Sequence, residues 1–301
     1  MRISVIIAAH NAAGTLGLAV ASSAWQTLPP HEIIVVDDGS VDGTAAVARA
    51  AGAICLSQPR RGVAAARNAA VRHASGDWVA VLDADDVWLP QRLERSAAVL
   101  GARRQPCVLG PDAWVWREPE DLRTALARRE SVFHDLCRLD LGLPPAQAVY
   151  RNAPIMHPLF PRAALLAEPY DEDLRVYEDT ELVWRLVACG LEMVFLNEPL
   201  GFYRVGCASL TRVQTPQEVC ARRLLMLERA LLRCGHNDQA AGAIRRDIAA
   251  CRRWQALMAF MDDVRAHRLG PGLRGFTPWM AWWAARHALE RSMHTGHHSA
   301  I

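Results

Sequence analysis

A chain of 301 residues that is 51% hydrophobic can form one large domain or two modest ones with a full core and no disulfide staples. The formal net charge of +2 gives no indication of a nucleic acid partner, and the absence of lysine excludes any mechanism that needs a side-chain amine. No uncharged apolar stretch approaches eighteen residues, so we expect no membrane-spanning helix.

The eight cysteines are scattered and include no C-x-x-C pair, so we expect them to be small core side chains in a reducing compartment. The N-terminal run Met1–Ile7 is shorter than the apolar region of a signal peptide and lacks a small-residue cleavage site. We therefore expect a cytoplasmic protein, with the inner face of the membrane as the alternative location.

The first hundred residues alternate between short apolar runs and helical patterns. In chain order we predict a strand at 3–9, a helix at 11–25 capped by Asn11, a strand at 32–37, a helix at 44–51, a strand at 54–56, a helix at 62–74, a strand at 79–82 and a helix at 91–100. This alternation predicts βαβ units, and therefore an α/β fold with a mainly parallel sheet flanked by helices.

The remainder of the chain is less regular and ends in helical patterns. We predict a charged helix at 118–139, a loop at 152–158, a helix at 162–166, a helix at 179–189 capped by Asp179 and followed by Gly190, a strand at 193–196, and helices at 218–234, 238–267 and 278–293.

The apolar strand at 79–82 leads directly into Asp83, Asp85 and Asp86. Ligands of open α/β sheets bind outside the carboxyl ends of strands, and three neighbouring acids repel one another unless a cation or a ligand's donors hold them. Carboxylate oxygens suit Mg²⁺ or Mn²⁺. The alternative is a polar loop that caps the next helix, but a cap needs one acid and not three.

Three further clusters have two interpretations each. Asp37 and Asp38 end a strand and could accept hydrogen bonds from a base or ribose, or could belong to an ordinary Asp-Gly-Ser turn. Arg67 could reach a diphosphate, or lie on a solvated helix face. Glu178 and Asp179 could supply a general base, or Asp179 could be a plain helix cap.

Four of these segments, taken together, resemble the family 2 glycosyltransferases of GT-A fold. The similarity in order and spacing runs from residue 3 to about 95, through Ser4–Asn11, Val35–Thr44, Gly62–Asn68 and Leu82–Asp86. It continues more loosely through Met156–Pro158, Glu178–Asp179, Glu198–Leu200 and Tyr203–Arg204, and we see none beyond about residue 215.

The resemblance implies a nucleotide-diphosphate sugar donor, a UDP-sugar on family grounds, together with Mn²⁺ or Mg²⁺ and inversion at the anomeric carbon. It assigns Asp38 to the nucleobase, Asp83 to the ribose, and Asp85, the last residue of the D-x-D motif, to the metal. Asp179 would deprotonate the acceptor hydroxyl, with Glu178 as its neighbour or as the base itself. Further nucleotide-sugar contacts would come from Ala8, His10, Asn11, Arg67 and Ala84.

The residue types fit this chemistry. A metal can neutralise the growing charge of a diphosphate leaving group. An aspartate with a pKa of about 3.9 is a weak base, and like-charge repulsion from Glu178 could raise that pKa.

The resemblance also gives an organisation of the chain. Residues 1–214 would form the GT-A domain, with a nucleotide-sugar-binding half at 1–100 and an acceptor-binding half at 101–214, followed by a helical extension at 215–301. The expected acceptor is a glycan or a lipid-linked sugar in polysaccharide or other glycoconjugate assembly. The Q-x-x-R-W motif of processive members is missing, which indicates transfer of single sugars, and Val205-Gly206-Cys207 follows Arg204 where many relatives carry a histidine.

Two rival functions remain to be tested. Asp83-Ala84-Asp85-Asp86-Val87 also matches the motif of haloacid-dehalogenase-like phosphatases, in which Asp83 would be the nucleophile and Asp85 the acid–base, but that mechanism relies on a lysine. The other rival is a binding protein that kept the fold and lost catalysis.

Residues 215–301 carry thirteen arginines and seven acidic residues, a balance of +6, with several tryptophans near the end. Residues 272–293 could therefore contact an anionic membrane surface, or pack on the main domain or on a second subunit. The sequence leaves the oligomeric state open.

Overall fold

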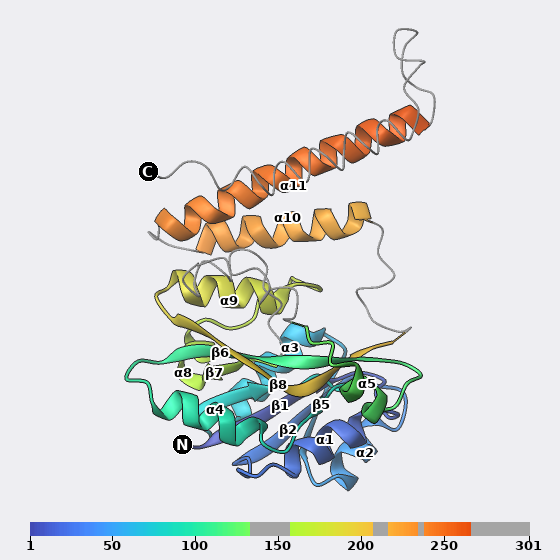
Figure 1. Ribbon diagram of the computed structural model, residues 1–301, viewed down its shortest axis with the longest axis vertical. Coiled ribbons are helices and arrows are strands. Elements are labelled where there is room, and N and C mark those ends of the chain that lie inside the picture. The colour runs from blue at the N-terminus through green and yellow to red at the C-terminus, as the bar shows by residue number, and fades with distance from the viewer. Residues whose placement is uncertain (133–156, 207–215, 234–237, 266–301) are drawn as a thin grey trace.

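The computed structural model describes residues 1–132, 157–206, 216–233 and 238–265. Within these residues the chain forms one eight-stranded sheet with helices on both faces and a helical hairpin stacked beyond one face (Figure 1). The strand order is β3-β2-β1-β4-β7-β6-β8-β5.

The first half of the sheet is parallel, as the alternation of the sequence predicts. Its strands are β1 (Ile3–Ala9), β2 (Glu32–Asp38), β3 (Ile54–Gln58) and β4 (Trp78–Val81). The helices between them are α1 (Leu16–Ala24), α2 (Thr44–Ala50) and α3 (Val63–His73). Consecutive parallel strands need such crossover helices, so this half is a series of βαβ units.

The second half of the sheet is mixed. Its strands are β5 (Val87–Trp88), β6 (Cys107–Arg117), β7 (Leu159–Pro161) and β8 (Glu192–Val205). Strand β7 runs antiparallel to β4 and β6, β6 and β8 are parallel, and β5 is antiparallel to β8. The accompanying helices are α4 (Arg92–Gly101), α5 (Leu122–Arg128), α8 (Arg162–Ala167) and α9 (Glu178–Ala188).

The alternation of side chains along β1 divides the core between the two faces of the sheet. Val5 and Ile7 pack on the face covered by α1, α2 and α4. Ile6 packs on the opposite face, in a cluster that includes residues of α3, α8 and α9.

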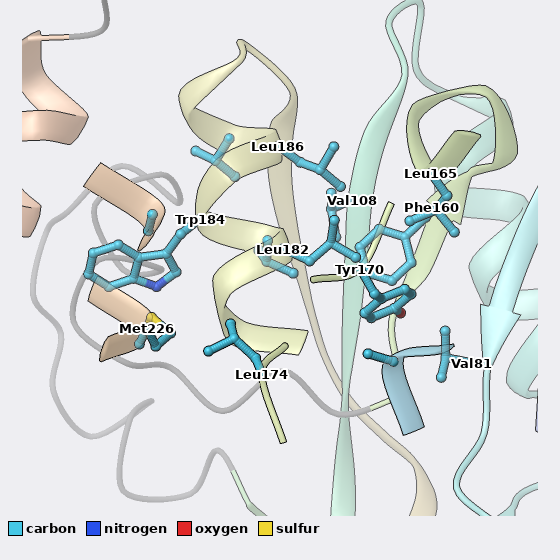
Figure 2. Close-up of a cluster of buried hydrophobic side chains, with 14 of the residues drawn as sticks. Val81, Val108, Phe160, Leu165, Tyr170, Leu174, Leu182, Trp184, Leu186 and Met226 are labelled. Carbon is cyan, nitrogen blue, oxygen red and sulfur yellow. The ribbon is translucent and has the colours of Figure 1, made fainter. Parts of the chain in front are cut away.

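The core on the α9 side continues into the helical hairpin formed by α10 (Pro216–Arg233) and α11 (Asp238–Arg265). Trp184 of α9 is fully buried and points toward Met226 of α10, while Leu182 and Leu186 of the same helix face the sheet (Figure 2). The division of the chain at residue 214 stays a proposal, since the described part of the extension shares this core. No described helix is long and apolar enough to cross a bilayer, and residues 272–293 lie outside the described ranges.

Two long strands were wrongly predicted. The sequence suggests irregular structure where β6 runs for 11 residues, and a four-residue strand where β8 runs for 14. Pro111 interrupts the strand pattern of β6, and Pro199 interrupts that of β8. The pairing of β6 with β8 shifts register between Pro111 and Asp112. A bulge of this kind admits proline inside a paired strand. The predicted helix at 118–139 is only the seven-residue α5 within the described residues, which stop at 132 before resuming at 157.

Candidate active site

The carboxyl ends of β1, β2 and β4 meet at one edge of the sheet because these three strands are parallel neighbours. Ala9 pairs with Asp37, and Ile6 pairs with Val81 two residues before Asp83. The loops that follow Ala9, Asp38 and Val81 therefore start side by side. This edge brings together the sequence motifs Ser4–Asn11, Val35–Thr44 and Leu82–Asp86.

Asp38 is buried and holds the loop that leads into α3. Its carboxylate accepts hydrogen bonds from Gln58 Nε2 at 2.7 Å, from the Arg61 backbone N–H at 2.8 Å and from the Gly62 backbone N–H at 2.7 Å. An ionised carboxylate has about four acceptor positions, so one position is left for a ligand donor.

The loop after β1 is tied to the loop after β2. His10 Nδ1 lies 2.9 Å from the Asp38 carbonyl oxygen, and its Nε2 contacts Arg60. Asn11 Oδ1 accepts from the Val41 N–H at 2.9 Å, while the Asn11 N–H donates to Ser40 Oγ at 2.9 Å. Asn11, with φ of 49°, is therefore not the predicted helix cap. Helix α1 begins at Leu16, and Asn11 joins two loops at the strand edge.

Arg67 connects the strand edge to α9. It lies in α3, is 6% exposed, and donates from Nη2 to Asp83 Oδ1 and from Nη1 to Glu178 Oε1, both at 2.7 Å. Its guanidinium carbon sits 5.5 Å from the centre of the Tyr170 ring. Arg67 is thus neither on a solvated helix face nor free to move toward a diphosphate without breaking two ion pairs.

Glu178 and Asp179 occupy the first turn of α9. Tyr177 precedes this helix with φ of 66°, so Asp179 is not the N-cap that the sequence suggests. Burial and the adjacent charge of Asp179 raise the pKa of Glu178 to about 7, although Arg67 acts in the opposite direction. Asp179 is half-buried, and its Oδ1 accepts from the Thr180 N–H at 2.6 Å.

The three acids after β4 have different surroundings. Asp86 is buried and pairs with His157 Nε2 at 2.7 Å, while its other oxygen accepts from the Arg204 N–H at 2.7 Å. Arg204 also donates to the Asp85 carbonyl oxygen at 2.7 Å. Asp86 is therefore a structural anchor for the loop, and His157 and Arg204 complete it. Their only sequence signal is the looser similarity around 156–158 and 203–204.

Asp85 is the acid that faces outward. Asp85 is exposed at the surface, but the protein around its carboxyl group displaces part of the solvent. This desolvation, together with the charges of Asp86 and Asp83, raises the pKa of Asp85 to about 6. Among the described residues no group of three or more His, Cys, Asp or Glu is arranged to hold a metal. One exposed carboxylate fits instead an ion that takes most of its ligands from water and substrate phosphates, as Mg²⁺ commonly does.

Comparison with known proteins gives this geometry its context. Residues 4–138 match the family model described as Glycosyl transferase family 2. Over 293 residues the chain is 28% identical to the succinoglycan biosynthesis protein ExoO of Rhizobium meliloti (strain 1021), covering 90% of this chain and 80% of that protein. A local match of 102 residues is 31% identical to the Escherichia coli protein UDP-Glc:alpha-D-GlcNAc-diphosphoundecaprenol beta-1,3-glucosyltransferase WfgD, covering 33% of this chain and 40% of that protein.

The fold is similar to that of S. aureus TarS 1-349 in complex with UDP-GlcNAc, with a TM-score of 0.62, 18% identity, and coverage of 88% of this chain and 81% of that one. It is also similar to the mannosyltransferase PcManGT from Pyrobaculum calidifontis in complex with GDP-Man and Mn²⁺, with a TM-score of 0.53, 19% identity, and coverage of 94% and 85%.

The architecture is the GT-A glycosyltransferase fold. Residues 4–138 are similar to glycosyltransferase family 2, and the chain is an enzyme of the glycosyltransferase class. The phosphatase alternative based on Asp83 and Asp85 is not favoured by these findings.

Proposed function

We propose that this enzyme is an inverting, metal-dependent and non-processive glycosyltransferase. It transfers one sugar from a nucleotide-diphosphate sugar to an acceptor hydroxyl of a glycan or lipid-linked sugar. The donor that we propose is a UDP-sugar. The product belongs to cell-surface polysaccharide or another glycoconjugate.

The Arg67 bridge is the observation that carries this proposal. Arg67 lies 16 residues before Asp83 and 111 residues before Glu178, and it binds both carboxylates. Asp83 at the strand edge and Glu178 at the start of α9 therefore bind the same guanidinium group. This arrangement fits a group-transfer site, in which donor and acceptor have to be held together in one geometry.

The strand edge is the donor side. Asp38 offers its remaining acceptor position to the nucleobase, and Asp83 has its second oxygen for a ribose hydroxyl. Ala8, His10, Asn11 and Ala84 lie on the same loops and strand end, where they line the nucleotide-sugar.

Asp85 holds the divalent ion, Mn²⁺ or Mg²⁺, together with the donor diphosphate. When bound there, the ion supplies positive charge that neutralises the leaving nucleoside diphosphate. The raised pKa of Asp85 supports this role, because a carboxylate that is partly desolvated and also crowded by two other acids gains most from a cation. The relation of the fold to PcManGT, whose structure holds Mn²⁺, is consistent with it.

Asp179 is the base for the acceptor hydroxyl. Glu178 is buried and has one oxygen bound to Arg67, whereas Asp179 is half-buried at the same helix start. Inversion follows if the acceptor hydroxyl attacks the anomeric carbon on the face opposite the diphosphate, with Asp179 taking its proton.

The acceptor class is supported by the names of the relatives. ExoO is a succinoglycan biosynthesis protein, and the name of WfgD specifies a sugar linked to diphosphoundecaprenol. An acceptor of this kind would bring the enzyme to a membrane surface, without a requirement for a spanning helix.

Calorimetric titration with UDP tests the donor site. We expect binding with Mn²⁺, much weaker binding in EDTA, and the same loss in Asp85→Ala. The matched control is Asp77→Ala, because Asp77 is an exposed acid at the opposite end of β4 that pairs with Arg2. Equal UDP affinity in EDTA would overturn the metal dependence. Binding of GDP or dTDP in place of UDP would overturn the donor, and no binding of any nucleotide would overturn the function.

A further inference from the structure

Residues 168–177, which we call the base loop, lead from α8 into the first turn of α9. The inference drawn from this loop rests on the proposed function, since it concerns how Glu178 and Asp179 are held. Tyr177 enters the helix in a left-handed conformation and provides no side-chain cap for it. The position of the two acids therefore depends on what fixes the loop before them.

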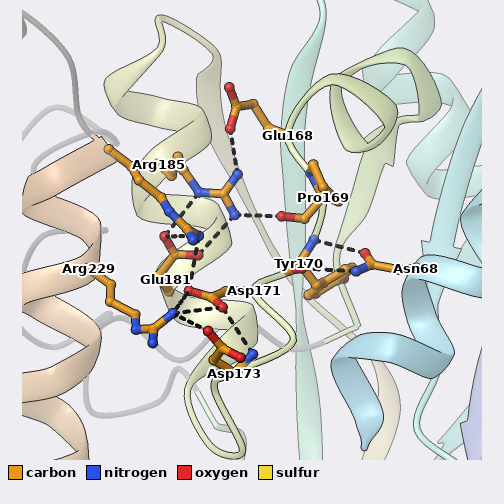
Figure 3. Close-up of polar contacts among 10 residues, drawn as sticks. Asn68, Glu168, Pro169, Tyr170, Asp171, Asp173, Glu181, Arg185 and Arg229 are labelled. Atoms are coloured by element: carbon orange, nitrogen blue, oxygen red, sulfur yellow. Dashed lines mark hydrogen bonds and ion pairs between the residues drawn. The ribbon is translucent and has the colours of Figure 1, made fainter. Parts of the chain in front are cut away.

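Helix α3 fixes the base loop from the sheet side. Asn68, buried and next to Arg67, donates from Nδ2 to the Tyr170 carbonyl at 2.9 Å, and its Oδ1 accepts from the Tyr170 N–H at 2.9 Å (Figure 3). The same Nδ2 also donates to Glu172 at 3.0 Å. The Tyr170 ring lies under Arg67. One turn of α3 thus binds both the loop and Glu178.

Helix α9 fixes the start of the base loop. Arg185 binds Glu181 of its own helix at 3.0 Å, Glu168 at 2.7 Å and the Pro169 carbonyl at 2.7 Å. Arg185 is 2% exposed and Glu181 is fully buried. Buried charges in this arrangement are fully paired, which makes the network rigid.

Helix α10 fixes the middle of the base loop from outside the sheet domain. Arg229 Nη1 contacts both oxygens of Asp171, at 3.1 and 2.8 Å, and Asp173 at 3.1 Å (Figure 3). Arg233 adds a contact to Asp171 at 3.1 Å. Asp171 is buried, and its Oδ1 also accepts from the Asp173 N–H. Two cations from α10 therefore converge on one buried acid of the loop.

We propose that Arg229 is a positioning residue for transfer: through Asp171 it holds the base loop, and with it the carboxylates of Glu178 and Asp179, in the geometry that the acceptor hydroxyl needs. The α10–α11 hairpin is then part of the catalytic unit. The donor side should depend little on Arg229, because Asp38 ends β2 and Asp83 and Asp85 follow β4. The base loop and the helix start reach this side only through the exposed Arg61–Glu172 pair and through helix α3, which carries Arg67 and Asn68.

The test compares Arg229→Ala and Arg229→Lys with Arg252→Ala. Arg252 lies on the same hairpin and pairs with exposed Glu228, so its loss removes an ion pair without touching the loop. A lysine can reproduce the single-nitrogen contact of Arg229, so Arg229→Lys should retain part of the function and guards against a variant that fails to fold.

Two readouts separate positioning from general stability. In Arg229→Ala we expect kcat to fall by up to about 10²-fold, since a displacement of about 1 Å can cost that much. The donor KM and the UDP affinity should stay within about twofold. We also expect faster amide hydrogen exchange over residues 168–181, and intermediate values for both readouts in Arg229→Lys. Arg252→Ala should behave as the wild type.

The outcomes are distinct. Arg229→Ala with wild-type kcat and wild-type exchange over 168–181 would overturn the positioning role, as would equal losses of kcat and UDP affinity. A wild-type enzyme without turnover on any donor would overturn the proposed function instead. Exchange over 168–181 would still decide the role of Arg229 in that case, because it does not require activity.

Discussion

The two ends of the Arg67 bridge are held in place by different means. Asp83 lies two residues after the end of β4, and the N–H of the intervening Leu82 donates to the Ile6 carbonyl at 3.0 Å, so the backbone ladder of the sheet fixes its position. Glu178 begins a helix without a side-chain cap and is held by Arg67 and by the base loop. The donor side is thus positioned by backbone, and the acceptor side by side-chain charges.

This difference predicts where the enzyme is easily damaged. A backbone ladder tolerates the loss of any one side chain, whereas removal of one partner from a buried ion pair leaves the other charge uncompensated. Substitutions on the acceptor side should therefore lower both the catalytic rate and the stability of the fold. Substitutions on the donor side should chiefly lower the affinity for the nucleotide and the metal ion.

The largest expected effect is that of Asp179→Asn. Loss of a general base typically costs about 10²–10⁴-fold in rate, so transfer should fall by that order while UDP affinity with Mn²⁺ stays unchanged. Steady-state transfer and calorimetry on the same preparation measure both quantities. Glu192→Gln, at an exposed acid that begins β8, is the control and should keep full activity. Turnover close to that of the wild type in Asp179→Asn would instead identify Glu178 as the base.

Arg67→Met should give the largest change in stability. It removes the counter-charge of buried Glu178, and breaking such a pair costs about 3–5 kcal/mol in other proteins. The loss should lie below that range, because Glu178, whose pKa is already raised to about 7, can take up a proton. Urea unfolding at pH 7 measures the free energy of unfolding. Arg61→Met is the matched control, because Arg61 forms an exposed pair with Glu172 that should contribute about 0–1 kcal/mol. Equal losses in the two variants would show that the bridge adds little to stability.

The sequence predicts the backbone-held side of the site far better than the side held by charges. Apolar runs and their spacing place β1, β2 and β4 in parallel, and parallel neighbours bring Asp38 and Asp83 to one edge without further information. The sequence groups Asp83, Asp85 and Asp86 only because all three are acidic. Their residue type does not reveal that Asp86 turns inward to His157, which is 71 residues away.

The acceptor side could not be predicted because its contacts join distant segments through side chains. Nothing local in the sequence shows that Arg67 reaches Glu178, or that α10 reaches Asp171. A cap assignment for Asp179 is a reasonable local reading, but the base loop overrides it by turning at Tyr177. The family resemblance singled out Glu178 and Asp179 as candidate bases. The contacts that hold these two residues in place are visible only in the three-dimensional structure.

The smallest expected effect is a change in pH-dependent stability in Asp85→Asn. The pKa of Asp85 is raised to about 6 in the folded state, so between about pH 4 and pH 6 the folded state binds more protons than the unfolded state. Stability then falls as the pH rises through this window. Asparagine removes this contribution, so Asp85→Asn should unfold at a higher temperature than the wild type at pH 7 and at the same temperature near pH 4.

Thermal unfolding in EDTA at both pH values measures this difference. Glu178, with its pKa raised to about 7, produces a decline of the same sign in both proteins, so only the difference between them reports on Asp85. Addition of Mn²⁺ and UDP should reverse the order, because only the wild type gains the stabilisation that a ligand gives to the folded state. If Asp85→Asn were the less stable protein at pH 7 in EDTA, the carboxylate would have a stabilising partner, and its assignment to the metal would lose its physical basis.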